Sequence, residues 1–486
     1  MEKYSLIKSS DSSAFFWFGL IYLLIPNILF MSHWLHASLF TPLILFIFFI
    51  FHSLRKTLPF NFQKSFRLSP LIKNYWFIAA IFLILLLSLS TGVGNFWYQN
   101  WDYTKHNGIY FDLIQSKWPA IVQLNHQDYY LVYYLAHYLL PALCGKIWTI
   151  GAMEIAAQFQ LFVGLFIIFG ILKNITKTKY FFPLVLSFIF WGGLDCIGRF
   201  SVQGDMNNFG ELGEWWAGAT TFQYTGFYDL LVWVPQHALA GWMSLLLVLI
   251  SLEKKIYRLI PFILAITLLW SPFAILGLIP FIFILFINLV IEKKLLGFVL
   301  SFEFLFSIIM LVLMGLYYSS INYTQPINWQ YLRLIPEEFF KRYPLFLFLE
   351  FLLISILIYP HRYLWPQTLK LCFFPVLLYL IFIPNVYFGA YSDYSMRASV
   401  PCLLYVFILY FFTVTHPLVS RRKKIILYFY ALVASYSAIS DIYRGFHLLE
   451  QKIPYTSVTR FDPDNLSKQY IGNKESFFFK YITPKN

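Results

Sequence analysis

The chain has 486 residues, of which 59% are hydrophobic and only 12% are charged, and its formal net charge is +13. A soluble domain of this size could not bury so much apolar surface, and the apolar runs are continuous rather than alternating, which excludes a transmembrane β-barrel. Nucleic acid is not indicated as a partner, because Lys and Arg cluster in short links between apolar runs. The sequence therefore predicts an all-α polytopic membrane protein.

About thirteen apolar runs are expected to cross the membrane as helices. The basic links between them, richest at 54–73, predict an N-terminus in the cytoplasm and a C-terminus on the outer side. No cleavable signal pattern precedes the first run, so that run is expected to be a retained helix. The expected spans are 14–32, 38–53, 74–94, 149–172, 180–198, 237–252, 259–270, 273–291, 295–318, 344–360, 370–385, 400–416 and 425–440.

The polar segments between these spans carry most of the carboxylates on the side expected to face outward. Residues 129–141 are predicted to form an interfacial helix, because five tyrosines and a histidine suit the depth of the lipid headgroups. The four cysteines are scattered and indicate neither a disulfide framework nor a metal site. The expected outer loops are 95–148, 199–236, 319–343 and 386–398, within a transmembrane domain over 1–440 that is followed by a short outer tail at 441–486.

The first outer loop begins with a carboxylate, an ammonium and an imidazole within five residues. Asp102, Lys105 and His106 are spaced so that one helical turn would place all three on one face. There a carboxylate could accept a proton from an incoming hydroxyl while the neighbouring cations hold a phosphate. Asp112 is a candidate second carboxylate of this site. The alternative for both carboxylates is a solvated helix end beside the membrane.

The second outer loop offers side chains suited to a sugar. Glu211 and Glu214 precede an aromatic pair that begins at Trp215, and an apolar sugar face can stack on such rings while the carboxylates bind its hydroxyls. An aromatic belt at the membrane surface is the alternative. Gln236 and His237 follow Pro235 at the start of a span, where they could line the same cavity or simply lie at the interface.

A late outer arginine completes the set of candidates. Arg397 lies at the mouth of a span on the side where Lys and Arg are depleted, which indicates a phosphate ligand, although a salt bridge to Asp393 four residues earlier would also explain it. No phosphate-binding Gly-rich loop, zinc-type spacing or Gly-x-Ser-x-Gly sequence is present, so nucleotide hydrolysis and serine chemistry are not indicated.

Together these features resemble the GT-C superfamily of integral membrane glycosyltransferases. The similarity rests on Asp102 just past a span, the expected interfacial helix at 129–141, and Arg397 shortly before Pro401. It implies transfer of a sugar from a polyprenyl-phosphate donor to a glycan, lipid or protein acceptor on the periplasmic face of a bacterial inner membrane, among membrane lipids. By the same resemblance Asp102 is the general base, and Arg397 with Lys105 holds the lipid phosphate.

Two features distinguish this sequence from the usual GT-C pattern. A pair of extra spans precedes the acidic loop, and Asp102 stands alone where the family has paired acidic residues. A divalent metal cofactor is therefore possible but unsupported, since a single carboxylate is a poor site for such an ion. The alternatives are a transporter or flippase for a lipid-linked glycan, which would need charges deep in its spans or broken helices, and a polymerase or ligase of surface polysaccharide.

Overall fold

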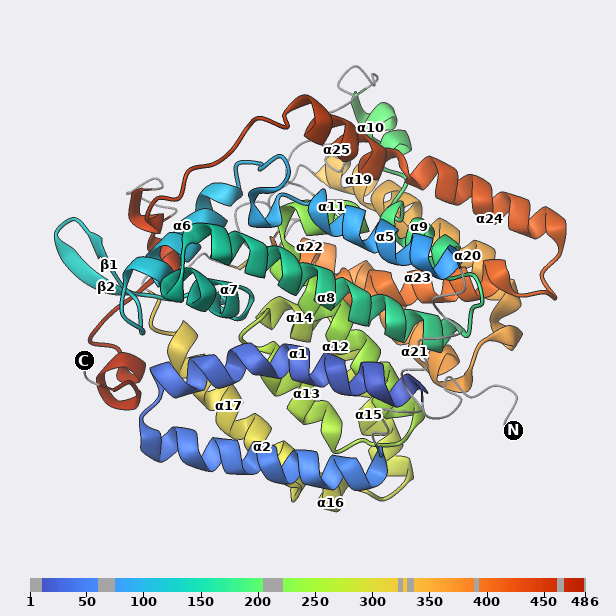
Figure 1. Ribbon diagram of the computed structural model, residues 1–486. Coiled ribbons are helices and arrows are strands. Elements are labelled where there is room, and N and C mark those ends of the chain that lie inside the picture. Colours follow the sequence, from blue (N-terminus) through green and yellow to red (C-terminus); the bar gives the residue numbers. More distant parts are fainter. Residues whose placement is uncertain are drawn as a thin grey trace.

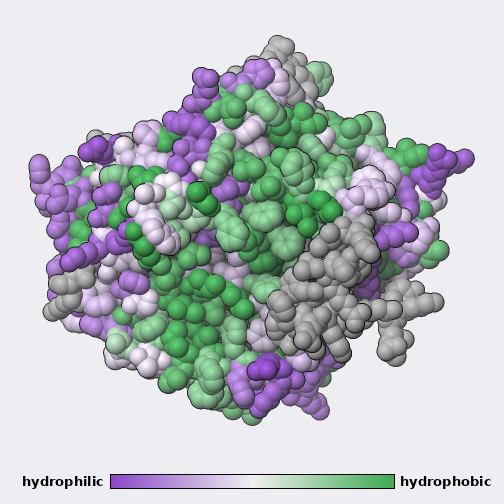
Figure 2. Space-filling model, viewed as in Figure 1, coloured by the Kyte–Doolittle hydropathy of each residue, from purple (hydrophilic) through white to green (hydrophobic). Residues whose placement is uncertain are grey.

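The computed structural model describes residues 11–59, 75–203, 222–321, 327–329, 336–388, 393–460 and 467–484. Its helices lie side by side in one bundle, with the start of helix α1 at one end and the hairpin β1–β2 and helix α6 toward the other (Figure 1). Figure 2 shows a hydrophobic belt across the middle of this face and hydrophilic surface toward both ends. Within the described residues, seven helical segments are long and apolar enough to cross a membrane. The chain is therefore a multi-pass helical membrane protein.

The long segments fall on seven of the expected spans, and four shorter apolar helices fall on four others. Two further expected spans contain only the nine-residue helices α9 (Phe181–Ile189) and α13 (Leu259–Thr267). The long segments are α1 (Asp11–Trp34), α2 (Ala37–Thr57), α8 (Ile150–Thr176), α12 (Pro235–Glu253), Phe339–Leu364, Gln367–Asn385 and Arg421–His447. The shorter helices are α5 (Tyr75–Leu89), α15 (Ile279–Ile291), α17 (Phe302–Tyr318) and α23 (Val400–Thr415).

Helix α12 forms the centre of the bundle. Its residues from Pro235 to Leu252 are all buried, which fits a helix that is apolar on every side. It packs against α1, α8, α13 and α23, and its Trp242 ring meets Phe188 edge to face with centroids 4.8 Å apart. The core therefore lies along α12, and the first turn of this helix reaches the end of the bundle that carries α6.

Three expected spans are interrupted, which corrects the prediction of continuous helices there. The run 180–198 breaks between α9 and α10 (Asp195–Gln203), where Gly193 leaves room for the Glu350 carboxylate. The run 273–291 divides at Gly277, whose bare Cα admits the Ala398 carbonyl, into α14 (Pro272–Leu276) and α15. The run 295–318 divides into α16 (Leu295–Val299) and α17. Hydropathy did not reveal the first two breaks, because each depends on a neighbour distant in sequence.

The prediction of a helix over 129–141 was wrong in its first part. Strands β1 (Ile121–Leu124) and β2 (Gln127–Leu131) form an antiparallel hairpin, and helix α7 begins only at Ala136 and ends at Ile147. The two turn residues, Asn125 and His126, have φ of 51° and 64°, as a two-residue type I′ turn requires. Tyr129 and Tyr130 are adjacent in β2 and so point to opposite faces of the strand, and tyrosine favours strands.

The C-terminal tail is part of the fold rather than an appendage. Strand β5 (Ile471–Gly472) pairs with β2, and the Phe479 ring stacks on Tyr130 with centroids 4.0 Å apart. Residues 451–458 run along α6 (Tyr103–Gln115), where Asn107 Nδ2 donates to the Ile453 carbonyl at 2.7 Å. The described residues of the tail pack against the hairpin and α6.

The remaining described elements are the parts of three long segments and several short helices and strands. Helices α19 (Pro336–Leu347), η3 (Phe348–Leu352), α20 (Leu353–Ile358) and η4 (Tyr359–Leu364) make up one long segment, α21 (Gln367–Phe382) and η5 (Ile383–Asn385) another, and α24 (Arg421–Ala434) and α25 (Tyr436–His447) the last. The others are η2 (Val93–Asn95), α11 (Phe227–Trp233), α22 (Asp393–Ala398), η6 (Val458–Arg460), η7 (Ser467–Tyr470), η8 (Phe478–Ile482), and the paired strands β3 (Asn328–Trp329) and β4 (Val386–Tyr387).

Replacing Gly108 with valine is expected to destabilise the protein by about 1–3 kcal/mol, the usual cost of overpacking. A Cβ at this position of α6 would lie 3.0 Å from the Thr456 carbonyl and 3.0 Å from Val458 Cγ1, so the tail would be pushed away. The matched control is Gly315→Val on α17, where a Cβ meets nothing within 4 Å. Melting temperatures in detergent compare the two variants, and equal melting would show that the tail yields without cost.

Candidate functional site

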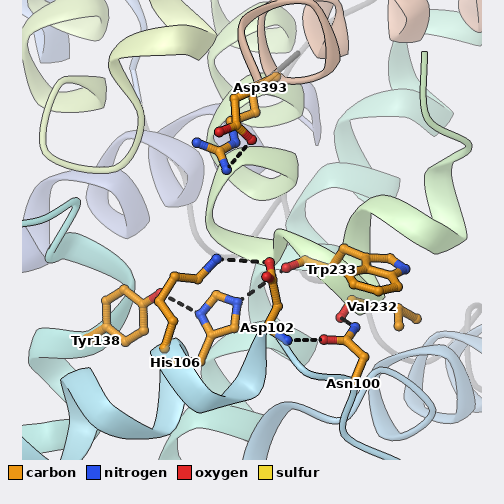
Figure 3. Close-up of polar contacts among 9 residues, drawn as sticks. Asn100, Asp102, His106, Tyr138, Val232, Trp233 and Asp393 are labelled. Carbon is orange, nitrogen blue, oxygen red and sulfur yellow. Dashed lines mark hydrogen bonds and ion pairs between the residues drawn. The ribbon is translucent and has the colours of Figure 1, made fainter. Parts of the chain in front are cut away.

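The start of α6 carries Asp102 in a fixed loop. The Asp102 backbone N–H donates to Asn100 Oδ1 at 2.9 Å, and Asn100 Nδ2 donates to the Val232 carbonyl at 3.0 Å (Figure 3). Lys105 Nζ donates to Asp102 Oδ2 at 2.9 Å, one helical turn along. The Lys105 side chain is 6% exposed and that of Asp102 is 14% exposed. The carboxylate is therefore held firmly yet keeps some accessible surface.

The positive charge of Lys105 is maintained by this contact. Burial lowers the pKa of the Lys105 ammonium, but the adjacent Asp102 carboxylate outweighs that effect and holds the pKa above its usual value. The predicted grouping of Asp102 and Lys105 on one helical turn is confirmed by the salt bridge. An ammonium has three donor hydrogens, so Lys105 can keep Asp102 and still donate to a further anion.

His106 is fixed by two partners other than Asp102. Its Nε2 lies 3.2 Å from the Trp233 carbonyl, which can only accept, so this nitrogen carries the proton. Its Nδ1 then accepts from the Tyr138 hydroxyl at 2.6 Å. Burial holds the pKa of His106 well below its usual value, and the charge of Lys105 lowers it further. His106 is thus a neutral imidazole that ties α6 to α7 and α11.

Arg397 on α22 lies over the ring of Phe273, with Cζ 5.5 Å from the centroid, and its Nη2 donates to Asp393 Oδ1 at 2.7 Å. The salt bridge that the i,i+4 spacing suggested is therefore present. Burial opposes the charge of Arg397, but Asp393 keeps its pKa above the usual value, and Asp102 contributes to the same effect. Figure 3 shows the Asp393 pair facing Asp102 from the opposite side. Two separate elements thus bring cations toward one carboxylate.

Gln236 and His237 lie fully buried in the first turn of α12. His237 Nδ1 is 2.6 Å from Ser271 Oγ, and its ring centroid is 6.0 Å from that of Phe273, the ring that also lies beneath Arg397. In the described part of the chain, His237 Nε2 and both polar atoms of Gln236 have no hydrogen-bond partner. Buried polar atoms of this kind are rare in native proteins unless a ligand or water completes them.

Asp112 does not join this group. It is 5% exposed, and its Oδ2 accepts the Val458 backbone N–H at 3.0 Å, so the carboxylate is directed toward the tail. Burial raises the pKa of Asp112 to about 6, even though the Val458 N–H lowers it. Its role in the structure is to connect α6 with η6.

Asp112→Asn is expected to remove a pH dependence of stability. Folding raises the pKa of this carboxyl, so its contribution to the free energy of unfolding is largest below pH about 4 and is lost as the pH rises to about 6. The whole contribution is about 3 kcal/mol at most. The asparagine stays neutral and can still accept from Val458. We expect the variant to melt higher than wild type at pH 7 and to lack the wild-type gain in stability between pH 7 and pH 4.

The control for this experiment is Asp128→Asn on the hairpin. That exposed carboxyl has its pKa lowered by Lys474 and Gln123, so it titrates below the window in question. The Asp128 variant should keep the wild-type pH profile of melting temperature in detergent. An unchanged profile in Asp112→Asn would show that this carboxyl titrates in the folded protein as it does in the unfolded chain.

Glu211, Glu214 and Trp215, the residues of the expected sugar platform, lie outside the described residues. Sequence reasoning missed the side chains packed around Trp233, the residue whose carbonyl accepts from His106. The Trp233 ring meets Trp101 with centroids 5.9 Å apart, and Arg444 Cζ lies 5.6 Å from its centroid. Arg444 pairs with Asp441 at 2.7 Å. The i,i+3 spacing of Asp441 and Arg444 at the end of a hydrophobic run was a usable signal.

No family model, curated protein or solved structure matches this chain. Among the described residues, no cluster of three or more His, Cys, Asp and Glu side chains could hold a metal ion. The described side chains of the site offer several chemical groups. These are a partly accessible carboxylate, an ammonium and a guanidinium that can bind an anion, and buried amide and imidazole groups that can donate to an uncharged ligand.

Proposed function

We propose that this protein is a GT-C-type membrane glycosyltransferase that moves a sugar from a polyprenyl-phosphate donor to a hydroxyl of a glycan, lipid or protein acceptor. The proposal includes thirteen spans, a cytoplasmic N-terminus, and an active site on the periplasmic face of a bacterial inner membrane. The observation that carries it is the convergence of Asp102, Lys105 and Arg397, from two distant elements, at one end of an apolar helical bundle. A lipid-linked phosphate requires both features, cations for its headgroup and a membrane for its tail.

Asp102 is the general base of this proposal. As the acceptor oxygen attacks the anomeric carbon, its proton passes to the carboxylate, and the bond from that carbon to the phosphate oxygen breaks. The side chain keeps 14% of its surface exposed, which an acceptor hydroxyl needs for contact. His106 is unsuited to the role, because its Nδ1 already accepts from Tyr138 and its Nε2 bears a proton.

Arg397 and Lys105 bind the phosphate and stabilise the charge that develops on it as it leaves. A guanidinium forms two parallel hydrogen bonds with a phosphate, and a partly buried site strengthens them. Arg397 uses Nη2 toward Asp393, and its Nε has no partner in the described structure. The pairing with Asp393 holds the side chain in place without exhausting its donors.

Gln236 and His237 are assigned to recognition of the sugar. Their unpartnered polar atoms are fully buried and lie next to the ring beneath Arg397. A sugar hydroxyl both donates and accepts, as the Gln236 amide does, so such a ligand would satisfy both of its atoms. Glu211, Glu214 and Trp215 remain further candidates for this role on the basis of sequence alone.

The experiment is incubation of the purified protein with a panel of polyprenyl-phosphate sugars and a mixture of hydroxyl acceptors, followed by detection of released polyprenyl phosphate. Release that requires both lipid-linked donor and acceptor supports the proposal. A protein that accepts only nucleotide sugars, or that releases no lipid phosphate from any donor, would contradict it.

A further inference from the structure

The end of the bundle remote from Asp102 contains a basic cavity of about 530 Å³. Its lining includes Lys255, Arg258, Lys293 and Lys294, and Glu303 is the one carboxylate among the described lining residues. Helix α13 begins at Leu259 beside this cavity and ends at Thr267, near Ser271, the partner of His237. The nine residues of α13 alone separate the two ends by about 13 Å, so this cavity is distinct from the site around Asp102.

The two turns beside the cavity, at Lys255 and at Lys293, are joined by an ion pair and a hydrogen bond. Glu292 Oε1 accepts from Lys255 Nζ at 2.7 Å and from the Tyr257 hydroxyl at 3.0 Å, and Glu292 Oε2 pairs with Lys294 at 2.5 Å. Lys255 and Lys293 both have positive φ, 57° and 54°, so the two turns have similar geometry. Arg258 and Lys293 are not ion-paired with any described residue. Two exposed cations therefore lie on turns that ion pairs connect, and both remain able to bind an anion.

An apolar groove of about 300 Å³ continues from the cavity between α13, α15 and α17. Leu289 and Phe298 line both spaces, so the groove and the cavity are contiguous. Among the residues that line the groove only Ser307 is polar, and its hydroxyl already donates to the Glu303 carbonyl. The groove reaches Leu268, toward the middle of the bundle, and these helices lie together at the lower edge of Figure 1.

Helix α16, which joins α15 to α17, is placed as a membrane-surface helix would be. Leu296 is 74% exposed and Leu300 is 76% exposed, and both lie within a few residues of Lys293 and Lys294. Exposed leucines beside lysines are the pattern of a segment that lies in the interface, with its apolar side chains among acyl chains and its charges among headgroups. The cavity therefore opens at headgroup depth.

We infer that the basic cavity and the apolar groove together form a binding site for an anionic phospholipid. Its headgroup phosphate is bound by Arg258 and Lys293, and one acyl chain lies along α13, α15 and α17. Lys and Arg residues are expected at this end of any membrane protein and would not by themselves indicate a binding site. Here the two turns are also joined by ion pairs beside unpaired cations, and an apolar groove is contiguous with the cavity. A basic pocket between membrane helices is the chemistry that selects anionic headgroups.

The test measures lipid-induced thermal stabilisation of the full-length protein in detergent micelles, with four probes titrated separately. These are phosphatidylglycerol, phosphatidylcholine, glycerol phosphate and polyprenyl phosphate. We expect phosphatidylglycerol to raise the melting temperature at lower concentration than the others. Arg258→Gln/Lys293→Gln should weaken its binding by tenfold or more, at about 1 kcal/mol for each cation. Ser307→Trp, which fills the groove, should weaken it as well.

The matched control is Arg421→Gln/Arg422→Gln, which removes two exposed arginines at the start of α24 that do not line the cavity. This variant should bind phosphatidylglycerol like wild type. Equal stabilisation by phosphatidylcholine, unchanged binding in the Arg258/Lys293 variant, or protection by glycerol phosphate alone would overturn the inference. Tighter binding of polyprenyl phosphate, lost in the same variant, would overturn it too by assigning the groove to the donor lipid. None of these readouts depends on sugar transfer.

Discussion

Asp102→Asn is expected to lower the rate of sugar transfer by about 10²–10⁴-fold, the usual contribution of a general base, while donor binding is retained. The asparagine keeps the size and hydrogen-bonding oxygen of the side chain but cannot take up the acceptor's proton. Steady-state kinetics would show the loss in kcat with little change in KM for the donor, because the phosphate is bound mainly by Arg397 in the proposed arrangement.

This variant leaves the Lys105 ammonium buried without its counter-ion, which can destabilise a protein by several kcal/mol. Asp102→Glu serves as the second variant, because it restores the charge but moves the carboxylate along α6. Melting temperatures separate the two effects, and Asp128→Asn on the hairpin is the control carboxylate. Full transfer activity in a well-folded Asp102→Asn protein would remove this residue from the chemistry.

Arg397→Gln is expected to raise KM for the polyprenyl-phosphate donor on the order of a hundredfold, the effect of losing a charge-assisted contact in a partly buried site. Arg397→Lys should recover only part of this loss, since an ammonium cannot form the two parallel bonds of a guanidinium. The affinity of the variants for sugar-free polyprenyl phosphate, measured directly, checks the same contact without the chemical step.

The matched variant is Asp393→Asn, which removes the partner of Arg397 at 2.7 Å and leaves the guanidinium in place. If Arg397 acts only in this salt bridge, both variants should change donor KM and melting temperature equally. If Arg397 binds phosphate, only its own replacement should abolish tight donor binding. A double-mutant cycle of the two gives the coupling energy of the pair.

Local spacing was sufficient to predict the Asp102–Lys105 contact, because residues three apart on a helix are neighbours whatever surrounds them. The same holds for Asp393 and Arg397. The partners of His106 were beyond that reasoning, since Tyr138 and Trp233 are 32 and 127 positions away in the sequence. The connection of Asp112 with Val458 spans 346 positions and was missed for the same reason.

Hydropathy located the long helices, because a run that must cross hydrocarbon has to be apolar throughout. It failed where a break depends on a close approach by another segment, as at Gly193 beside Glu350. It also failed in the hairpin, where two of the tyrosines that suggested an interfacial helix, Tyr129 and Tyr130, lie in β2 instead. A turn signal was present in Asn125, a residue that tolerates positive φ.

The most direct measurement uses proteoliposomes that contain the purified protein, a labelled polyprenyl-phosphate sugar and an acceptor, with transferred sugar and lipid translocation followed in the same sample. The expected result is transferred sugar in wild type, with transfer at least a hundredfold slower in folded Asp102→Asn protein. The contradictory result is labelled lipid-linked glycan that crosses the bilayer without transfer, which would make the protein a transporter and Asp102 a residue of its pathway.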